Sequence, residues 1–273
     1  MKKRVLLIIA YEGTAYGGFA RQKNAKTITG ELEDALASAT GEKILLIGGS
    51  RTDAGVHAMG NVAVFDTESP IPGDRFAPAL NRRLPADIRV LRSFEVSLDF
   101  HPLHEASVKT YAYRILQTPC QDPLRRNFTW HIHRPLNLNA MKDAVVYLQG
   151  EHDFTSFCAA GSQTKTKVRT LYSVEVYSKE DEIVLEVRGN GFLYNMVRII
   201  TGTLVQVGLG RITPEALPGI LEAKDRSKAG PTAPPQGLTL LKYEFASIQN
   251  PLDLKNTSFV TIHNPADFLR PMS

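Results

Sequence analysis

Apolar segments follow one another in the same order in both halves of this chain, and this order constrains the fold more than any other feature. In the first half, four compact apolar runs are typical of buried strands: Val5–Tyr11, Ile44–Ile47, Asn61–Asp66 and Asp87–Phe94. Two helices are expected among them, one capped by Thr27 with Leu32 and Leu36 in its apolar stripe, the other short, over Arg75–Arg83. The order is strand, helix, strand, strand, helix, strand.

The second half repeats this order with insertions. Strands are expected over Val108–Leu116, Leu171–Tyr177, Ile183–Arg188 and Leu238–Phe245. Helices are expected over Ala140–Leu148 and Phe192–Val207, and a further helix has Thr213 as its N-cap and Pro214 at its first position. The segment Gly48–Gly60 is expected to be a loop.

This repeated order predicts an α+β protein built of two β-α-β-β-α-β halves, of the ferredoxin-like or RRM-like kind, with mainly antiparallel sheets. We place the halves at residues 1–103 and 104–246, with a tail at 247–273. A central basic cleft is expected between the halves. The same order builds RNA-binding sheets and also many domains that bind no nucleic acid, so it does not define a function.

Several functional classes find no support in the sequence. The apolar run Val5–Ala10 is too short to span a bilayer and is followed by no small-residue cleavage site, so we expect a soluble, cytoplasmic protein. Cys120 and Cys158 are the only cysteines and form neither a disulfide framework nor a CxxC motif. His131 and His133 could share a strand face as a metal pair, but no third ligand is apparent. We therefore expect neither a metal nor a cofactor.

The net charge of +4 says less than the distribution of the charges. Residues 75–92 hold five cations and one acid, and residues 154–173 hold three cations and no acid. Such runs can be solvated loop charges, or they can be the footprint of a phosphate backbone. Composition leaves both interpretations open.

The most informative segment is the glycine-rich stretch from Gly48 to Gly60, which contains Arg51 and Asp53. Glycines let a backbone approach a ligand closely. An arginine within ~4–6 Å lowers the pKa of an aspartate by about 1–3 units, which would keep such a carboxylate ionised as a nucleophile. The alternative is an aspartate that stabilises a turn, with the arginine as its surface partner.

The core of this loop, Arg51-Thr52-Asp53-Ala54-Gly55-Val56-His57, resembles the signature loop of the tRNA pseudouridine synthases that modify the anticodon arm, the TruA family. Further resembling blocks follow in order, among them Tyr11-Glu12-Gly13-Thr14, Leu84-Pro85-Ala86-Asp87-Ile88, Lys109-Thr110-Tyr111, Asn195-Met196-Val197-Arg198 and Ala233-Pro234-Pro235-Gln236-Gly237-Leu238. The resemblance runs from about residue 3 to residue 245. It implies the pseudouridine synthase fold and the isomerisation of uridine to pseudouridine in the anticodon stem-loop of tRNA, at positions 38–40. It also implies a homodimer.

The resemblance assigns residues to this reaction. Asp53 matches the catalytic aspartate of the family, and Tyr111 matches its active-site tyrosine, which would stack on the extruded uracil. Arg198 matches a helical arginine, and we expect it to pair with Asp53 between the halves. Arg51 would contact a phosphate or assist extrusion of the base. We expect His57 to be structural, with its ring hydrogen-bonded locally.

Each of these residues also has a simpler interpretation. Tyr111 could belong to the core, and Arg198 could be an exposed surface arginine. Two other functions compete with the isomerase. A catalytically silent RNA-binding protein of the same fold would explain the basic segments but not Asp53. An aspartyl-phosphate phosphotransferase would need further carboxylates for magnesium, and only one acid lies between residues 48 and 60.

Overall fold

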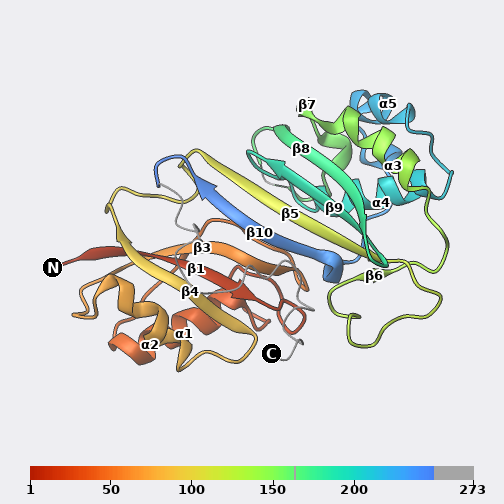
Figure 1. The fold of residues 1–273 in the computed structure, drawn as a ribbon. Helices are drawn as coiled ribbons and strands as arrows, with labels where there is room; N and C mark the ends of the chain where they lie inside the picture. Colours follow the sequence, from red (N-terminus) through yellow and green to blue (C-terminus); the bar gives the residue numbers. More distant parts are fainter. Residues whose placement is uncertain (163, 249–273) are drawn as a thin grey trace.

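In the computed structural model, which describes residues 1–162 and 164–248, the strands form one long, twisted sheet (Figure 1). Its strands are β1 (Lys3–Tyr11), β2 (Ile47–Gly48), β3 (His57–Thr67), β4 (Ile88–Val96), β5 (Ser107–Leu116), β6 (Trp130–His131), β7 (Gly150–Asp153), β8 (Val168–Lys179), β9 (Glu182–Gly189) and β10 (Leu238–Phe245). The helices of this part of the chain are α1 (Ile28–Thr40), α2 (Phe76–Asn81), α3 (Leu138–Val145), α4 (Met196–Gly208) and α5 (Ala216–Ala223). The predicted α+β class with mainly antiparallel pairing is confirmed.

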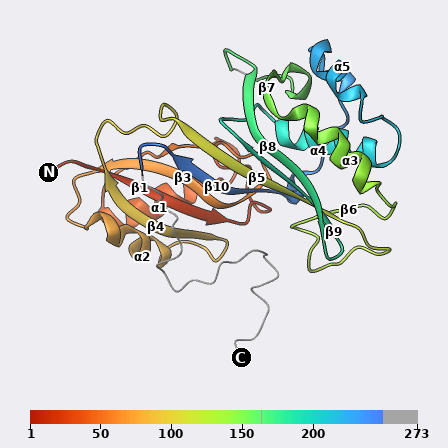
Figure 2. The same ribbon diagram turned by 45° about the horizontal axis from the view of Figure 1, so that its top comes forward.

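The sheet joins the two predicted halves through its last strand. Its order is β4-β1-β3-β10-β5-β9-β8-β7, with β2 paired to β3 and β6 paired to β5. The strand β10 is antiparallel to β5 and runs parallel to the start of β3, where Thr239 pairs with His57 and Leu240 with Ala58. Figure 2 shows β10 lying between β3 and β5. The division at residue 103 stays a prediction, because hydrogen bonds of one sheet cross it.

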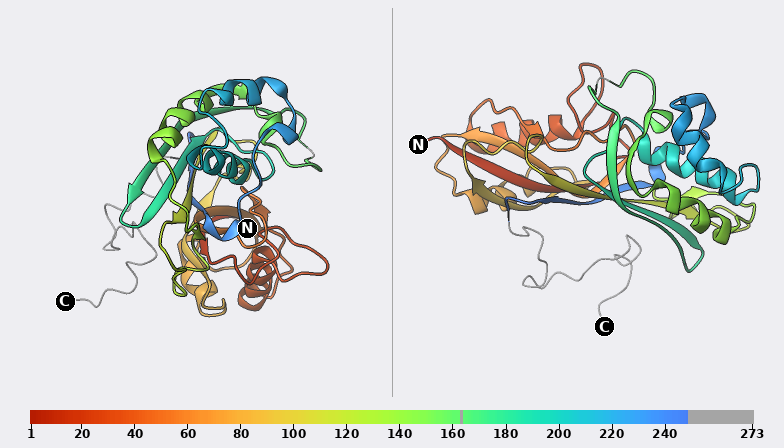
Figure 3. Two further views of the ribbon diagram at one scale, coloured as in Figure 1. Left: turned by 90° about the vertical axis from the view of Figure 1, so that its right-hand side faces the viewer. Right: turned by 90° about the horizontal axis from the view of Figure 1, so that it is seen from above.

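Helices cover the sheet at both of its ends. Helices α1 and α2 lie on the first strands, and α3, α4 and α5 lie on the strands of the second half (Figure 3). Thr27 caps α1 as predicted, since its side chain accepts a hydrogen bond from the backbone N–H of Gly30 at 3.2 Å. No helix in residues 1–162 or 164–248 is long and apolar enough to cross a membrane.

Several predicted boundaries in the first half are wrong. Of the second predicted strand, Ile44–Ile47, only Ile47 pairs with β3, and the pairing continues to Gly48 in the predicted loop. Ile44 is buried but unpaired with β3, because an apolar run reports burial as well as strand pairing. The strand β3 begins at His57, inside the predicted loop. The helix expected over Arg75–Arg83 is a 3₁₀ turn at Gly73–Arg75 followed by α2.

Helix starts and short strands account for the errors in the second half. The helix expected from Phe192 begins at Met196, because Asn195 has a left-handed φ of 60° that a helix cannot contain. The helix α5 begins at Ala216 rather than at Pro214. The sequence analysis did not predict β6 and β7, which are short and carry no alternating apolar pattern. Within the predicted tail, residues 249–273 lie outside the described part.

Helix α4 is buried around almost its whole circumference rather than along the single stripe that we expected. The hydroxyls of Thr201 and Thr203 are buried and donate 2.8 Å hydrogen bonds to carbonyls one turn earlier. Gly202 lies directly against the Pro231 carbonyl, and a side chain at position 202 would overlap this oxygen. The glycine therefore lets the segment of residues 231–233 pack against the helix.

Replacing Gly202 by alanine tests this close approach. We expect Gly202→Ala to lower the free energy of unfolding by about 1–3 kcal/mol, because the helix and the Pro231 segment must separate. Gly219→Ala is the matched control, since Gly219 also lies in a helix but faces open space, and it should stabilise by about 0.5–1 kcal/mol. Urea unfolding measures both, and equal effects of the two changes would contradict the packing described.

Candidate active site

Asp53 lies on a loop that the sheet places at the join between the two halves. This Asp53 loop (residues 49–56) runs from β2 to β3 and lies beside β10, which pairs with the first residues of β3. The backbone N–H of Phe19 donates to the Thr52 carbonyl at 3.0 Å, and Gly18, with a φ of 112°, leaves no room for a side chain against the same carbonyl. The loop is therefore held in place by its backbone.

Side chains on strands of the first half hydrogen-bond to the Asp53 loop. The Tyr11 hydroxyl lies 2.8 Å from the Thr52 hydroxyl. The amide of Asn61 donates to the Tyr11 hydroxyl and to the Ser50 carbonyl, both at 2.9 Å. All four residues are buried, so these hydrogen bonds replace water and favour one loop conformation.

The second half holds the same loop through Tyr111 on β5. The Tyr111 hydroxyl lies 2.9 Å from the Ser50 hydroxyl, and its ring contacts the edge of Phe192 with centroids 5.0 Å apart. Burial raises the pKa of Tyr111 to about 12, so the hydroxyl stays protonated at neutral pH. Tyr111 is thus a core residue, as the simpler interpretation holds, and its hydroxyl also reaches the Asp53 loop.

The predicted pairing of Asp53 with Arg198 is confirmed. The Arg198 Nη1 atom lies 3.6 Å from a carboxylate oxygen of Asp53. The same guanidinium donates 2.7 Å hydrogen bonds to the Asn195 side chain and to the Ala233 carbonyl. Arg198 is only 15% exposed, so it is not the surface arginine of the simpler interpretation. Its three partners fix the position of the charge in front of Asp53.

The direction of the pKa shift of Asp53 differs from our expectation. Burial raises the pKa of Asp53 above its ordinary value, and the positive charge of Arg198 opposes this rise. The expectation that Arg51 lowers the pKa of Asp53 is wrong. The Arg51 side chain is exposed and, among the residues described, makes no hydrogen bond or ion pair, so it is not the surface partner of Asp53 either. It remains free to meet a ligand.

His57 is a structural residue, as we expected. Its Nδ1 accepts a hydrogen bond from the Gly13 N–H at 3.0 Å. Its Nε2 lies 2.8 Å from the Asn127 carbonyl and 3.2 Å from the Gln236 carbonyl, and because carbonyl oxygens only accept, Nε2 carries the proton. Burial lowers the pKa of His57. Both ring nitrogens are occupied, so the neutral ring joins three segments rather than transferring protons.

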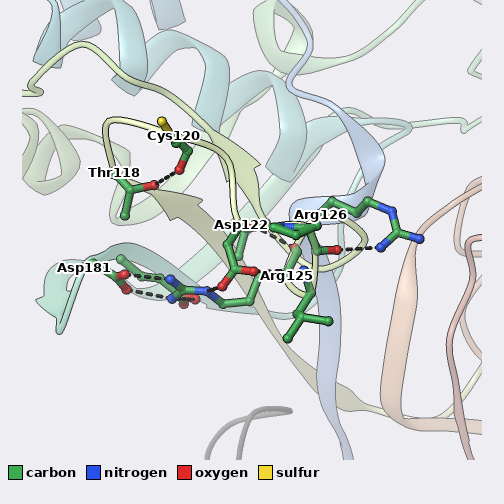
Figure 4. Close-up of polar contacts among 10 residues, drawn as sticks. Thr118, Cys120, Asp122, Arg125, Arg126 and Asp181 are labelled. Carbon is green, nitrogen blue, oxygen red and sulfur yellow. Dashed lines mark hydrogen bonds and ion pairs between the residues drawn. The ribbon is translucent and has the colours of Figure 1, made fainter.

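Ion pairs of Arg125, which the sequence analysis missed, hold the loop that carries Asn127, the hydrogen-bond partner of His57. Arg125 donates to Asp122 at 2.8 Å and to both carboxylate oxygens of Asp181 at 2.6 and 2.7 Å (Figure 4). These bonds fix the loop of residues 117–129 on the turn between β8 and β9. The ring of Phe128 then lies 4.9 Å from the ring of His57. A polar loop sequence gives no sign of such an anchor.

One open cavity, of about 380 Å³, borders the Asp53 loop at Gly55 and also reaches Asn127. A second, of about 580 Å³, is lined by Lys109 and Tyr243 and by no residue of the loop. Neither is lined by Asp53, whose side chain is itself 26% exposed. His131, of the possible metal pair, donates to the Thr118 carbonyl at 2.7 Å, and the described residues contain no group of three metal-binding side chains.

These contacts place a single, partly exposed carboxylate opposite a fixed guanidinium, an arrangement that suits an enzyme using a carboxylate nucleophile. Residues 7–103 and 144–246 match the family described as tRNA pseudouridine synthase. A tRNA pseudouridine synthase A from Acetivibrio thermocellus is 49% identical over 241 residues, which cover 88% of this chain and 98% of the relative. Proteins of the same name from Brevibacillus brevis and Halalkalibacterium halodurans are 49% and 47% identical, covering 87% and 86% of this chain and 98% and 90% of the relatives. The chain belongs to the tRNA pseudouridine synthase family.

The charge of Asp53 should reduce the stability of the fold. A carboxyl group whose pKa is higher in the folded protein than in the unfolded chain costs stability once the pH exceeds both values. Asp53→Asn should therefore raise the free energy of unfolding at pH 7, since Arg198 keeps its bonds to Asn195 and Ala233.

Asp66→Asn is the matched control for this measurement. Arg4, at 2.6 Å, lowers the pKa of Asp66, so the Asp66 charge adds stability that is present at neutral pH and lost as the pH falls through this lowered pKa. Asp66→Asn should lower the free energy of unfolding at pH 7. Urea unfolding at pH 7 compares the two, and destabilisation by Asp53→Asn as well would argue against the charge cost.

Proposed function

We propose that this protein isomerises uridine to pseudouridine in the anticodon stem-loop of tRNA, at positions 38–40, with Asp53 as the nucleophile. The observation that supports this most is the position of Asp53 at the join of the two halves. There its carboxylate faces Arg198, and its loop contacts Tyr111 through Ser50. The names of the relatives support tRNA as the substrate. We further propose that the protein is cytoplasmic and acts as a homodimer on the anticodon arm.

The reaction needs no oxidant and no group donor. The bond between N1 of uracil and C1′ of the ribose breaks, the base turns, and a bond forms between C5 and C1′. The proton on C5 leaves and N1 gains one, so atoms and electrons balance. A carboxylate that attacks the base or the sugar divides this exchange into two easier steps. Asp53 is proposed to supply it, since the Arg198 charge favours the ionised form.

The neighbouring side chains have distinct proposed roles. The aromatic ring of Tyr111 stacks on the extruded uracil, a contact worth ~1–3 kcal/mol per base. Its hydroxyl bond to Ser50 keeps the ring beside the Asp53 loop. Arg51, exposed and unpaired in the described structure, enters the space that the base leaves or binds a phosphate there. Extrusion costs a few kcal/mol, which such a cation helps to offset.

The substitution Asp53→Asn tests the proposed chemistry directly. It replaces the nucleophile by a neutral group of the same size, so tRNA binding should persist while isomerisation falls below detection. The assay measures tritium release from 5-tritiated uridine in tRNA, and sequencing maps the pseudouridines formed. Tritium release by the variant at the wild-type rate would overturn the role of Asp53.

The same assay separates the isomerase from the catalytically silent RNA-binding protein. That alternative predicts binding of the anticodon arm with no pseudouridine formed by the wild-type protein. Asp66→Asn serves as the control for the assay, because it also removes one carboxylate charge but lies away from the Asp53 loop, at the far end of strand β3. It should retain wild-type activity.

A further inference from the structure

Three cations from separate segments lie close together beside Tyr111 without a carboxylate to balance them. Arg51 comes from the Asp53 loop, Lys109 from the start of β5 and Arg169 from the start of β8. Repulsion from Arg169 and Arg51 contributes to the low pKa of Lys109, so both arginines lie near enough to act on its charge. Within residues 1–162 and 164–248, none of the three forms an ion pair with a carboxylate.

Lys109 has only weak partners although its side chain is half-buried. Its ammonium donates to the Gly49 carbonyl at 3.2 Å and lies 4.6 Å from the centre of the Tyr243 ring. Burial, followed by repulsion from the two arginines, lowers the pKa of Lys109 to about 8. Buried ammonium groups are normally paired with an anion, because removing the charge from water is costly. The site therefore lacks the anion that its charges require.

The register of the sheet brings Lys109 and Arg169 to one face. Lys109 pairs with Gly189 of β9, and Gly189 pairs on its other side with Leu171 of β8. Arg169 precedes Leu171 by two residues, so its side chain leaves the sheet on the same face as Leu171 and Lys109. Gly189 contributes no side chain between them. Because β5 and β8 are two strand spacings apart, about 10 Å, both long side chains can reach one ligand.

The polar contacts of Arg169 are with its own segment and leave its charge without an anion. Its Nη1 donates only to backbone carbonyls, those of Thr166 and Val168, and its Nε lies 3.4 Å from the point where a side chain at Gly191 would begin. Burial lowers the pKa of Arg169. Tyr111, two residues after Lys109 on the same strand face, continues the row toward Asp53. The cations thus lie next to the place proposed for the extruded base.

We infer that Lys109 and Arg169, together with Arg51, bind one phosphodiester group of the RNA strand that flanks the target uridine. The inference rests on the proposed function, because it assigns the neighbouring phosphate of the same substrate. A phosphodiester carries one negative charge over two oxygens, so an ammonium and a guanidinium can each take an oxygen. Its binding would supply the counter-charge that these three cations lack.

Removal of either cation should reduce the salt dependence of RNA binding. Each phosphate contact contributes about 0.7–0.9 to the slope of log affinity against log salt concentration. We expect Lys109→Met and Arg169→Met each to reduce the affinity for an anticodon-arm hairpin about tenfold and to make this slope shallower by up to one phosphate contact. Lys179→Met is the matched control, since Lys179 is exposed at the opposite end of β8 and should change neither quantity.

A neutral phosphate identifies the contact itself. Replacing a phosphodiester that flanks the target uridine by a methylphosphonate removes its charge and leaves the bases unchanged. The wild-type protein should lose about tenfold in affinity at one such linkage, and Lys109→Met should lose nothing further there. Lys109→Arg should restore the sensitivity, because it restores the charge. Equal losses in wild type and Lys109→Met at every linkage, or an unchanged salt slope, would overturn the inference.

The outcomes also separate this inference from the proposed function and from misfolding. If the wild-type protein forms no pseudouridine in the hairpin, the proposed function fails. If it forms pseudouridine while Lys109→Met binds the hairpin as tightly as wild type, only the phosphate site fails. Because the pKa of Lys109 is lowered in the fold, its charge costs stability at pH 7, so Lys109→Met should raise the urea midpoint while weakening RNA binding. Loss of the folded transition in urea would reject the variant, and Lys109→Gln then replaces it in the same measurements.

Discussion

The pairing of β10 with both β3 and β5 is the constraint on which the site depends. The last strand of the second half enters the sheet beside the first residues of β3, directly after the Asp53 loop. This pairing brings a loop of the first half against Tyr111 of β5, while the segment preceding β10 contacts Arg198 through Ala233. Without this pairing, the Asp53 carboxylate and the Arg198 guanidinium would belong to two halves with separate sheets. The site is therefore a product of the whole topology rather than of a local motif.

Two charged side chains near the join of the halves, Asp53 and Lys109, lie in unfavourable electrostatic surroundings. Partial burial raises the pKa of Asp53, and partial burial together with repulsion from two arginines lowers the pKa of Lys109. Each shift means that the charged form costs stability in the folded protein. By contrast, His57 is kept neutral with both nitrogens hydrogen-bonded, and Arg125 is balanced by Asp122 and Asp181. Balanced charges hold the framework, and unbalanced ones lie where a substrate is proposed to bind.

The parts of the fold that local patterns determine could be predicted from the sequence. The strands β1, β5, β9 and β10 were predicted within two residues, because buried strands carry dense or alternating apolar residues. The start of α4 was not, since the left-handed conformation of Asn195 depends on its surroundings. The pairing of β10 with β3 joins residues almost two hundred positions apart and leaves no periodic signal.

The site could be predicted only in part. Asp53, Tyr111 and Arg198 were named through the family resemblance, and the pairing of Asp53 with Arg198 is found in the structure. The sequence gives no sign of the raised pKa of Asp53, the exposure of Arg51 or the unpaired charge of Lys109. These properties depend on how deeply each side chain lies in the fold, which no short motif reports. Carboxyl NMR of Asp53, by comparison of wild type with Arg198→Met, measures the central interaction most directly. We predict a pKa above that of an ordinary aspartate in wild type and a higher one in the variant, whereas an unchanged pKa would contradict the pairing on which the account rests.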